Sequence, residues 1–210
     1  MKKFGALFDL DGVLIDSESR YTVFWESMER EFPTGIPDYA RAIKGSTLEA
    51  IIGNYPEHQR AEIIDRLMQF QSNMVYELYP GVLEFLDSLA AEGIRSAIVT
   101  SSDPHKMEVL FRQIPALRRR FACVVDGSMV THSKPHPEGY LLAARMIGMD
   151  PADCCVFEDS LQGLRAGRAA GGKVVGLSTT YGRELVEPLA DITVGALAEL
   201  TPQSVADLWT

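Results

Sequence analysis

The feature that most limits the possible folds of this chain is a regular alternation of strand-like and helical stretches after Pro80. Short apolar runs alternate there with stretches in which apolar residues recur every three or four positions. We expect strands over 95–100, 122–126, 154–157, 173–177 and 191–194, and helices over 82–91, 104–114, 137–147 and 161–170. Strands that alternate with helices form a parallel sheet covered on both faces. The sequence therefore predicts an α/β fold with a doubly wound, Rossmann-like parallel sheet.

A further strand and a helical insertion precede this alternating part. The apolar run at 5–8 predicts a buried strand. The segment 16–79 has no convincing strand, and its periodicity predicts helices over 17–32, 38–43, 48–52 and 57–79, with Ser46 able to cap the third. We therefore expect a sheet domain formed by 1–15 and 80–210, with an all-helical domain at 16–79 inserted into it.

Two carboxylates, Asp9 and Asp11, come directly after the first predicted strand. Side chains alternate along a strand with a period of two, so these two would point to the same face. Like charges about 5 Å apart repel by roughly 3 kcal/mol at an effective dielectric near 20. A cation, a proton or water must relieve that repulsion. The pair alone leaves open a simpler interpretation, an exposed strand end followed by an acidic turn.

Polar motifs also follow three other predicted strands. Thr100-Ser101-Ser102 end the second strand, Lys134-Pro135 lie in the loop after the third, and Glu158-Asp159-Ser160 end the fourth. The carboxyl ends of parallel strands share one edge of the sheet, where ligands bind. Each motif alone could be a helix cap or a solvated loop. Together, the four motifs predict one site at this edge.

Composition narrows the class of protein. Acidic residues outnumber basic ones by 29 to 20 without a basic stripe, which argues against a nucleic-acid partner. No apolar run reaches the roughly 18 residues of a membrane span, and the N-terminus lacks the apolar region of a secretory signal. Cys123, Cys154 and Cys155 lie in expected core strands, so we expect them to be buried and reduced in a cytoplasmic protein.

With these motifs the chain resembles the haloacid dehalogenase-like superfamily, in the subfamily with a helical cap inserted after the first motif. It is most similar to the phosphatases and the β-phosphoglucomutase-like members. The motifs that carry the resemblance are Asp9-Leu10-Asp11-Gly12-Val13, Ile98-Val99-Thr100-Ser101, Lys134-Pro135 and Val156-Phe157-Glu158-Asp159-Ser160. They span the sheet domain, whereas the cap matches only in position and helical character.

The resemblance implies that Asp9 is a nucleophile that forms an aspartyl-phosphate, which divides one difficult hydrolysis into two easier steps. It implies that Asp11 is the general acid and base, and we expect the adjacent carboxylate to raise the pKa of Asp11. By the same resemblance, Thr100, Ser101 and Lys134 would bind the phosphate. A hydroxyl group, backbone N–H groups at a helix start and an ammonium group suit that task.

Four carboxylates, those of Asp9, Asp11, Glu158 and Asp159, would meet a phosphate dianion in this site. A cation is therefore required, and hard oxygen ligands suit Mg²⁺, which we expect as the cofactor. The resemblance places Asp9 and Asp159 on the metal through their side chains and Asp11 through its backbone carbonyl. It leaves Glu158 either directly bound or one layer further out.

The inserted cap would supply specificity and exclude water. Candidate residues for contact with the substrate are Glu18, Tyr21, Trp25, Lys44 and Thr47. Tyr21 and Trp25 could instead belong to the hydrophobic core of the cap, and Lys44 to a solvated turn. β-Phosphoglucomutases typically carry an arginine and a histidine in the cap and a Lys-Asn pair after the second motif. The corresponding positions here hold Thr47 or Leu48, Tyr21, and Asp103-Pro104.

We therefore expect a Mg²⁺-dependent phosphatase for a small phosphorylated metabolite, such as a sugar or polyol phosphate, working as a monomer or weak homo-oligomer. The first alternative is a β-phosphoglucomutase-type hexose phosphate mutase. A metal-free dehalogenase is a second alternative, against which Asp11 and the Glu158-Asp159 pair argue. The third is a signalling module phosphorylated on aspartate. The position of Asp9 on the first strand and the long insertion argue against that class.

Overall fold

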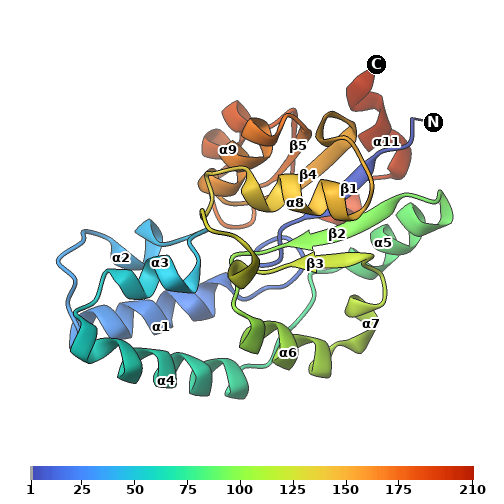
Figure 1. Ribbon diagram of the computed structural model, residues 1–210. Helices are drawn as coiled ribbons and strands as arrows, with labels where there is room; N and C mark the ends of the chain where they lie inside the picture. The colour runs from blue at the N-terminus through green and yellow to red at the C-terminus, as the bar shows by residue number, and fades with distance from the viewer. Residues whose placement is uncertain (1) are drawn as a thin grey trace.

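The computed structural model describes residues 2–210, whose strands form one six-stranded sheet (Figure 1). The strands are β1 (Gly5–Phe8), β2 (Arg95–Val99), β3 (Cys123–Val125), β4 (Cys154–Glu158), β5 (Lys173–Leu177) and β6 (Ile192–Val194). All pairings are parallel, in the order β3-β2-β1-β4-β5-β6. The predicted doubly wound parallel sheet is confirmed.

The strand order places β1 in the middle of the sheet, between β2 and β4. Leu7 of β1 pairs with Ala97 on one side and Val156 on the other. Successive strands are added outward from β1 in one direction first and then in the other, so the order reverses at β1. Such a reversal opens a crevice at the carboxyl ends of the strands, where ligands bind in open α/β sheets.

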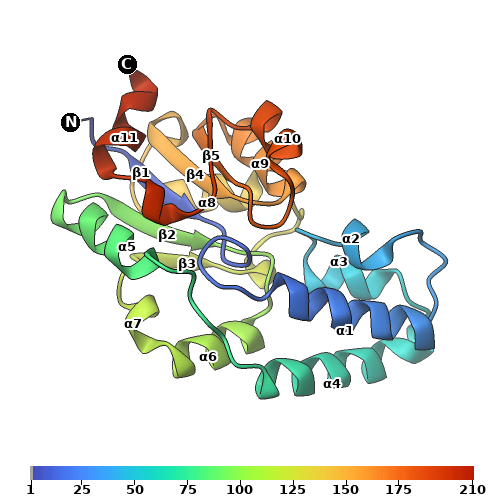
Figure 2. The ribbon, with the colours of Figure 1, turned by 180° about the vertical axis from the view of Figure 1, so that it is seen from behind.

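Helices cover both faces of the sheet (Figures 1 and 2). The residues Phe8 and Phe157, whose rings stack with centroids 4.3 Å apart, belong to the hydrophobic cluster on one face. Leu7 and Val156 belong to the cluster on the other face, as the period of two requires. The first cluster includes residues of four helices: α5 (Val82–Ala91), α6 (Pro104–Gln113), α7 (Pro115–Arg118) and α11 (Pro202–Ala206). The second cluster includes residues of three helices: α8 (Glu138–Met146), α9 (Leu161–Ala170) and α10 (Arg183–Val186).

Two expectations from composition concern residues within this sheet and its helices. All three cysteines are buried and unpaired, as predicted. Across residues 2–210, none of the helices combines the length and the apolar character that a membrane crossing would need.

Four helices between β1 and α5 lie beyond the carboxyl ends of the strands (Figure 1). They are α1 (Glu18–Glu31), α2 (Tyr39–Ala42), α3 (Leu48–Gly53) and α4 (Glu57–Asn73). They share a hydrophobic cluster of their own, which includes Phe24, Trp25, Tyr55 and Leu67. We call these four helices and the loops between them the cap. The expected domain bounds of 16–79 stay a prediction.

The helix expected over 57–79 ends earlier than predicted, at Asn73. The chain after it is extended and runs beside the segment that leaves β1, where the Asp16 N–H donates to the Glu77 carbonyl at 3.0 Å. This pairing satisfies backbone groups while the chain returns to the sheet. A continued helix would carry the chain away from the sheet instead.

The cap of α3 also differs from the expectation. Thr47, not Ser46, precedes the helix, and its hydroxyl accepts a hydrogen bond from the Ala50 N–H at 3.4 Å. Ser46 is one residue too early, because the capping side chain must reach the second or third N–H of the helix.

Candidate active site

Asp9 lies where the backbone leaves β1, and it is only 8% exposed. Its N–H donates to the Phe157 carbonyl at 2.9 Å, which holds the residue between β1 and β4. Its carboxylate accepts a hydrogen bond from Lys134 Nζ at 2.5 Å. The turn that follows requires Gly12, whose φ is +78° and whose added Cβ would lie 2.0 Å from Asp159 Oδ2. The turn therefore brings the first and last acidic motifs into contact.

Glu158 is fully buried at the end of β4, and donors occupy both oxygens of its carboxylate. One oxygen accepts hydrogen bonds from Lys134 Nζ at 2.6 Å and from the Tyr140 hydroxyl at 2.8 Å. The other accepts from the N–H groups of Asp159 and Ser160, each at 3.0 Å. A carboxylate with this many partners holds Lys134 in place and shapes the turn that carries Asp159.

Lys134 lies between two carboxylates, and the three groups set one another's charge. Burial alone would lower the pKa of the Lys134 ammonium group, but Asp9 and Glu158 raise it above its usual value. Burial raises the pKa of Asp9, Lys134 lowers it, and the charges of Glu158 and Asp11 raise it further. The net result is a pKa of about 8. A further cation beside Asp9 would favour its ionised form at neutral pH.

The carboxylates fit such a cation. Asp159 is 1% exposed, and its Oδ1 is buried without a hydrogen-bond partner. Burial and the charges of Glu158 and Asp9 raise the pKa of Asp159 well above its usual value. Each of these three residues offers a carboxylate oxygen within 4.8 Å of the others. A buried oxygen without a partner is costly, and a hard divalent cation would satisfy it.

Thr100 and Ser101 follow β2 and line the same cleft as Asp9. The Thr100 hydroxyl accepts a hydrogen bond from the Ser102 N–H at 3.0 Å, at the turn that leads into α6. The Ser101 hydroxyl donates to the carbonyl of Gly45, in the cap, at 2.7 Å. Thr100 therefore belongs to the floor of the cleft, whereas Ser101 joins the floor to the cap.

Asp11 has a cationic partner that the sequence analysis did not single out. Lys106 Nζ lies 2.5 and 2.6 Å from the two oxygens of Asp11, and the hydroxyl groups of Ser17 and Ser102 also donate to them. Burial would raise the pKa of Asp11, but the Lys106 ion pair and these hydrogen bonds lower it below its usual value. The expected rise is wrong, because the Lys106 ion pair and the hydrogen bonds from Lys106, Ser17 and Ser102 together outweigh burial.

The sequence does contain a signal for Lys106. It is the third residue of α6 and is only 3% exposed, next to Met107 and one turn before Leu110 on the buried side of the helix. A lysine is rarely buried unless it is paired. A lysine on the apolar face of a helix that starts at the sheet edge is thus a candidate site residue.

The cleft between the sheet edge and the cap encloses about 830 Å³ of empty space, including its open mouth. Four of the five predicted cap residues line it: Glu18, Tyr21, Trp25 and Lys44. Lys44 Nζ pairs with the Glu18 carboxylate at 2.5 Å. Trp25 is 5% exposed and also belongs to the hydrophobic cluster of the cap, and its contact with a substrate stays a prediction.

The cap is docked on the sheet domain through the loop before α3 and through helix α4. Thr47, the fifth predicted cap residue, is not among the residues that line the cleft. Its hydroxyl lies 2.9 Å from the Ser133 hydroxyl, in the loop that carries Lys134. On the other side of the cleft, Gln71 Nε2 of α4 donates to the Asp103 carboxylate at 2.7 Å. Polar contacts at both ends thus hold the cap over the acidic residues.

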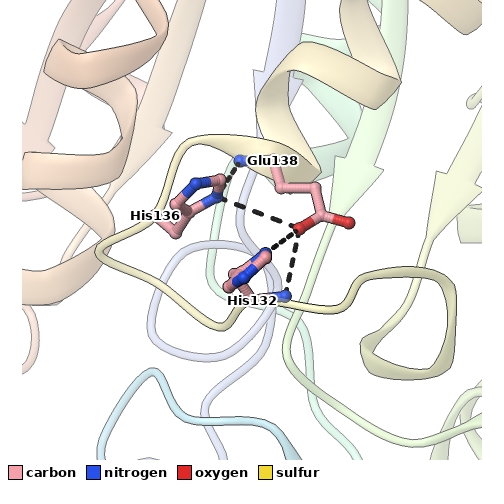
Figure 3. A group of neighbouring side chains, drawn as sticks. All are labelled: His132, His136 and Glu138. Carbon is pink, nitrogen blue, oxygen red and sulfur yellow. Dashed lines mark hydrogen bonds and ion pairs between the residues drawn. The ribbon is translucent and has the colours of Figure 1, made fainter.

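The loop that carries Lys134 is fixed from its outer side by Glu138 (Figure 3). The Glu138 carboxylate accepts hydrogen bonds from the N–H groups of Thr131 and His132 at 2.9 and 3.0 Å. His132 Nδ1 lies 2.9 Å from the same carboxylate, and the exposed ring of His136 packs beside that of His132. Glu138 therefore fastens the loop to the start of α8.

A sequence profile described as haloacid dehalogenase-like hydrolase matches residues 5–171. The chain belongs to this family. Hexitol phosphatase B of Escherichia coli (strain K12) is 28% identical to this hydrolase over 95% of both chains. Beta-phosphoglucomutase of Mycobacterium bovis is 31% identical over 92% of the hydrolase and 90% of its own length. A crystal structure of CbbY from Rhodobacter sphaeroides in complex with phosphate matches with a TM-score of 0.78 and 25% identity, covering 94% and 96% of the two chains.

The family resemblance stated from the motifs is thus confirmed. As a member of the family this hydrolase is an enzyme, and relatives named as phosphatases agree with the expected activity. The structure brings the predicted core residues together at one edge of the sheet: Asp9, Asp11, Thr100, Ser101, Lys134, Glu158 and Asp159. Their individual roles, the cytoplasmic location and the oligomeric state stay predictions.

Proposed function

We propose that this hydrolase is a Mg²⁺-dependent phosphatase that removes phosphate from a sugar or polyol phosphate through an aspartyl-phosphate on Asp9. The observation that carries the proposal is the convergence of Asp9, Lys134 and the unpartnered oxygen of Asp159 beneath a docked cap. A nucleophilic carboxylate, a fixed ammonium group and a cation site are the parts that phosphoryl transfer requires.

The cation would be held by the side chains of Asp9 and Asp159, with the Asp11 carbonyl as a further ligand. When bound, Mg²⁺ offsets the negative charge of the phosphate and of the surrounding carboxylates. Glu158 would stay outside the ligand set, because hydrogen-bond donors already occupy both of its oxygens.

In the first step a carboxylate oxygen of Asp9 attacks phosphorus, and the bond from phosphorus to the leaving oxygen breaks. Asp11 must first take up a proton, against the Lys106 ion pair that lowers its pKa, and it then gives that proton to the leaving oxygen, since an alkoxide is a poor leaving group without one. In the second step Asp11 takes a proton from the water that attacks the phosphorus of the phospho-enzyme, which frees Asp9 and releases phosphate. Lys134 holds its charge beside Asp9 throughout.

The charges in the cleft favour hydrolysis over the mutase alternative. The cations among the described residues that line the cleft are Lys44, Lys106 and Lys134. Each is paired with a carboxylate: Glu18, Asp11, and both Asp9 and Glu158, respectively. A mutase must hold a second phosphate group, and the described residues that line the cleft offer no unpaired cation for it.

The cap side of the cleft supports a polyhydroxylated leaving group. Trp25 and Tyr21 offer aromatic surface there, and Glu18 offers a hydrogen-bond acceptor. An aromatic face packs against the C–H face of a sugar, while polar groups at the edge bind its hydroxyls. The name of the relative hexitol phosphatase B agrees with this substrate class.

The test is phosphate release from a panel of phosphate esters, measured with and without Mg²⁺. The panel contains a hexitol phosphate, a hexose 6-phosphate, phosphoglycolate, a pentulose bisphosphate and p-nitrophenyl phosphate. We expect the hexitol or hexose ester to give the highest kcat/KM, and chelation to abolish turnover. Asp9→Asn should lose activity, whereas Asp16→Asn, a change in the same segment outside the cleft, should retain it.

Three results would contradict the proposal. Activity in Asp9→Asn would exclude the proposed nucleophile. Interconversion of hexose 1- and 6-phosphates that depends on a bisphosphate would identify a mutase. A long-lived phospho-aspartate with negligible turnover would favour the signalling module.

A further inference from the structure

Lys106 is a buried lysine whose ammonium group has one acidic partner. Its side chain is 4% exposed, and Nζ contacts both oxygens of Asp11 at 2.5 and 2.6 Å. Burying a lysine is costly and is seldom repaid by one ion pair. Met107 and Leu110 already supply the apolar contacts of this helix. The position of Lys106 is therefore better explained by its effect on Asp11 than by stability.

The cap completes the environment of this ammonium group. Lys106 Nζ lies 4.2 Å from the centroid of the Tyr21 ring, on α1 of the cap, a distance at which a cation is attracted to an aromatic face. Tyr21 is itself fixed by the ring of Phe70 from α4, 5.2 Å away and edge-on. The ammonium group thus lies between a carboxylate of the sheet domain and an aromatic ring of the cap.

The first turn of α6 is also clamped by the cap. Asp103 caps the helix by accepting a hydrogen bond from the Lys106 N–H at 3.0 Å. The other Asp103 oxygen accepts a hydrogen bond from Gln71 of α4 at 2.7 Å. The cap thus contacts Lys106 directly, through the Tyr21 ring, and indirectly, through Gln71 and the Asp103 side chain that caps the helix.

We propose that Lys106 is a positioning residue, which holds the Asp11 carboxyl group on the cap side of the cleft and does so fully only when the cap is docked. The inference rests on the proposed function, in which Asp11 acts on the leaving oxygen. Ser17 and Ser102 are the other side chains that donate to Asp11, and each carries a single hydroxyl. Without Lys106, the Asp11 carboxyl group loses its two-point anchor and its link to the Tyr21 ring, and keeps only the single hydroxyl groups of Ser17 and Ser102.

The experiment is a double-mutant cycle of Lys106→Met and Asp11→Asn, read as kcat/KM on two substrates. The alkyl substrate is a hexitol phosphate, whose leaving oxygen needs a proton. The aryl substrate is p-nitrophenyl phosphate, whose leaving group needs none. We expect Lys106→Met to reduce kcat/KM at least tenfold on the alkyl ester and less than threefold on the aryl ester. In the Asp11→Asn background the same change should have less than a twofold effect.

Lys44→Met is the matched control, because Lys44 also lines the cleft but pairs with Glu18 rather than Asp11. The fold-reduction in kcat/KM caused by Lys44→Met should multiply with the fold-reduction caused by Asp11→Asn, as expected for independent sites. Lys106→Arg should recover part of the loss on the alkyl ester, because a guanidinium group can bind both oxygens of a carboxylate. If Lys106→Met does not fold, Tyr21→Leu replaces it in the same double-mutant cycle, since it removes the cap side of the Lys106 contact. Its effect on the alkyl ester should then largely disappear in the Asp11→Asn background, whereas a lost sugar contact would persist there.

The inference would be overturned if the reductions in kcat/KM caused by Lys106→Met and Asp11→Asn multiplied in the double mutant. Equal reductions on the alkyl and aryl esters in Lys106→Met would also overturn it. These results are distinguishable from failure of the proposed function. That function fails if Asp9→Asn remains active. If Asp9→Asn is inactive while the cycle shows independent effects, only the role of Lys106 is refuted.

Discussion

At the scale of single residues, three aspartates in one cleft acquire different protonation behaviour from their neighbours. Burial raises the pKa of Asp9 to about 8, although Lys134 opposes the rise. Lys106 holds the pKa of Asp11 below its usual value against the effect of burial. Asp159 has no hydrogen-bond partner at Oδ1, and its pKa is raised well above the usual value by burial and by the neighbouring carboxylates. Chemically identical groups are thus prepared for different tasks.

Asp159→Asn should uncouple stability from Mg²⁺. In a chelator, the variant should unfold at a higher temperature than the wild type, because Asn avoids the cost of burying a carboxyl group whose pKa is raised well above its usual value by burial and neighbouring carboxylates. At one hundred times its Kd, Mg²⁺ should raise the free energy of unfolding of the wild type by about 2.7 kcal/mol, which raises the unfolding midpoint, and it should leave the midpoint of the variant unchanged. Differential scanning calorimetry measures both effects.

Asp103→Asn is the control for this prediction. Asp103 also lines the cleft, but it bonds to Gln71 and caps α6. Asp103→Asn should lower the thermal unfolding midpoint, but Mg²⁺ should still raise the midpoint of this variant. An equal Mg²⁺ shift in Asp159→Asn and the wild type would rule out Asp159 as a ligand.

At the scale of elements, loops decide how the cap and the sheet domain meet. The Gly45 carbonyl accepts a hydrogen bond from Ser101, and Thr47 contacts the Ser133 hydroxyl. Glu138 fastens the Lys134 loop from the opposite side (Figure 3). Thr47, Ser133 and Glu138, which are not among the residues that line the cleft, thus support the groups proposed to be catalytic.

Gly45→Ala should impair catalysis, whereas Gly35→Ala should not. Both glycines have positive φ, +83° and +76°, so alanine costs roughly 1–2 kcal/mol of backbone strain at either position. An added Cβ at Gly45 lies 3.3 Å from Cβ of Gln162, in the sheet domain, whereas Gly35 has nothing within 4 Å. We expect similar losses of stability, and a several-fold lower kcat/KM only for Gly45→Ala. Equal kcat/KM values would show that this contact does not limit docking.

Glu138→Gln should reveal a pH-dependent contribution to stability. The Thr131 N–H and the His132 side chain hold the pKa of Glu138 at about 2, below its usual value of 4.5. A depressed folded-state pKa stabilises the protein above the unfolded-state pKa, and the contribution is lost as pH falls. The difference in unfolding midpoint between wild type and variant should therefore be constant above about pH 5 and shrink from about pH 4.5 towards pH 2.

Glu108→Gln is the surface control for Glu138→Gln, since Glu108 only forms an exposed pair with Arg112. Its effect on the unfolding midpoint should be small at every pH. A midpoint difference for Glu138→Gln that stays the same at low pH would contradict the proposed hydrogen bonding of the ionised carboxylate.

At the scale of the whole molecule, the strand order separates the site from the end of the sheet that both termini reach. Figure 2 shows α11 and the start of β1 side by side, away from the cap. There the ring of Trp209 stacks on Phe4 with centroids 5.6 Å apart and donates to the Ala152 carbonyl at 3.0 Å. Lys2 Nζ lies 5.4 Å from the same ring. This end of the sheet contributes to stability without contact with the cleft.

Trp209→Ala should therefore reduce stability and leave catalysis unchanged. We expect a loss of about 2 kcal/mol, less than for a fully buried tryptophan, and a midpoint lower by about 4–8 °C. The measurement pairs thermal unfolding with kcat/KM at 25 °C, well below the transition. A loss of kcat/KM larger than twofold would show that the two ends of the sheet are coupled.

The sequence alone determined the features that depend on local pattern. Alternating apolar runs and helical periodicity predicted the parallel sheet, since each element must bury a face of known period. The acidic pairs at strand ends located the site, because carboxyl ends of parallel strands share one edge. Lys134 is the clearest case. It lies 125 positions from Asp9 and 24 positions from Glu158 in the sequence, yet the order of the strands brings all three side chains into contact.

Tertiary structure decided what depends on contacts between distant segments. The chain beyond Asn73 is extended rather than helical because it pairs with the segment that leaves β1. The pKa of Asp11 falls rather than rises because Lys106, 95 positions away, meets it in space. Local sequence gives the period and the face of an element. Electrostatic partners across the cleft are fixed only when the elements pack, because charge interactions depend on distance in space and on burial.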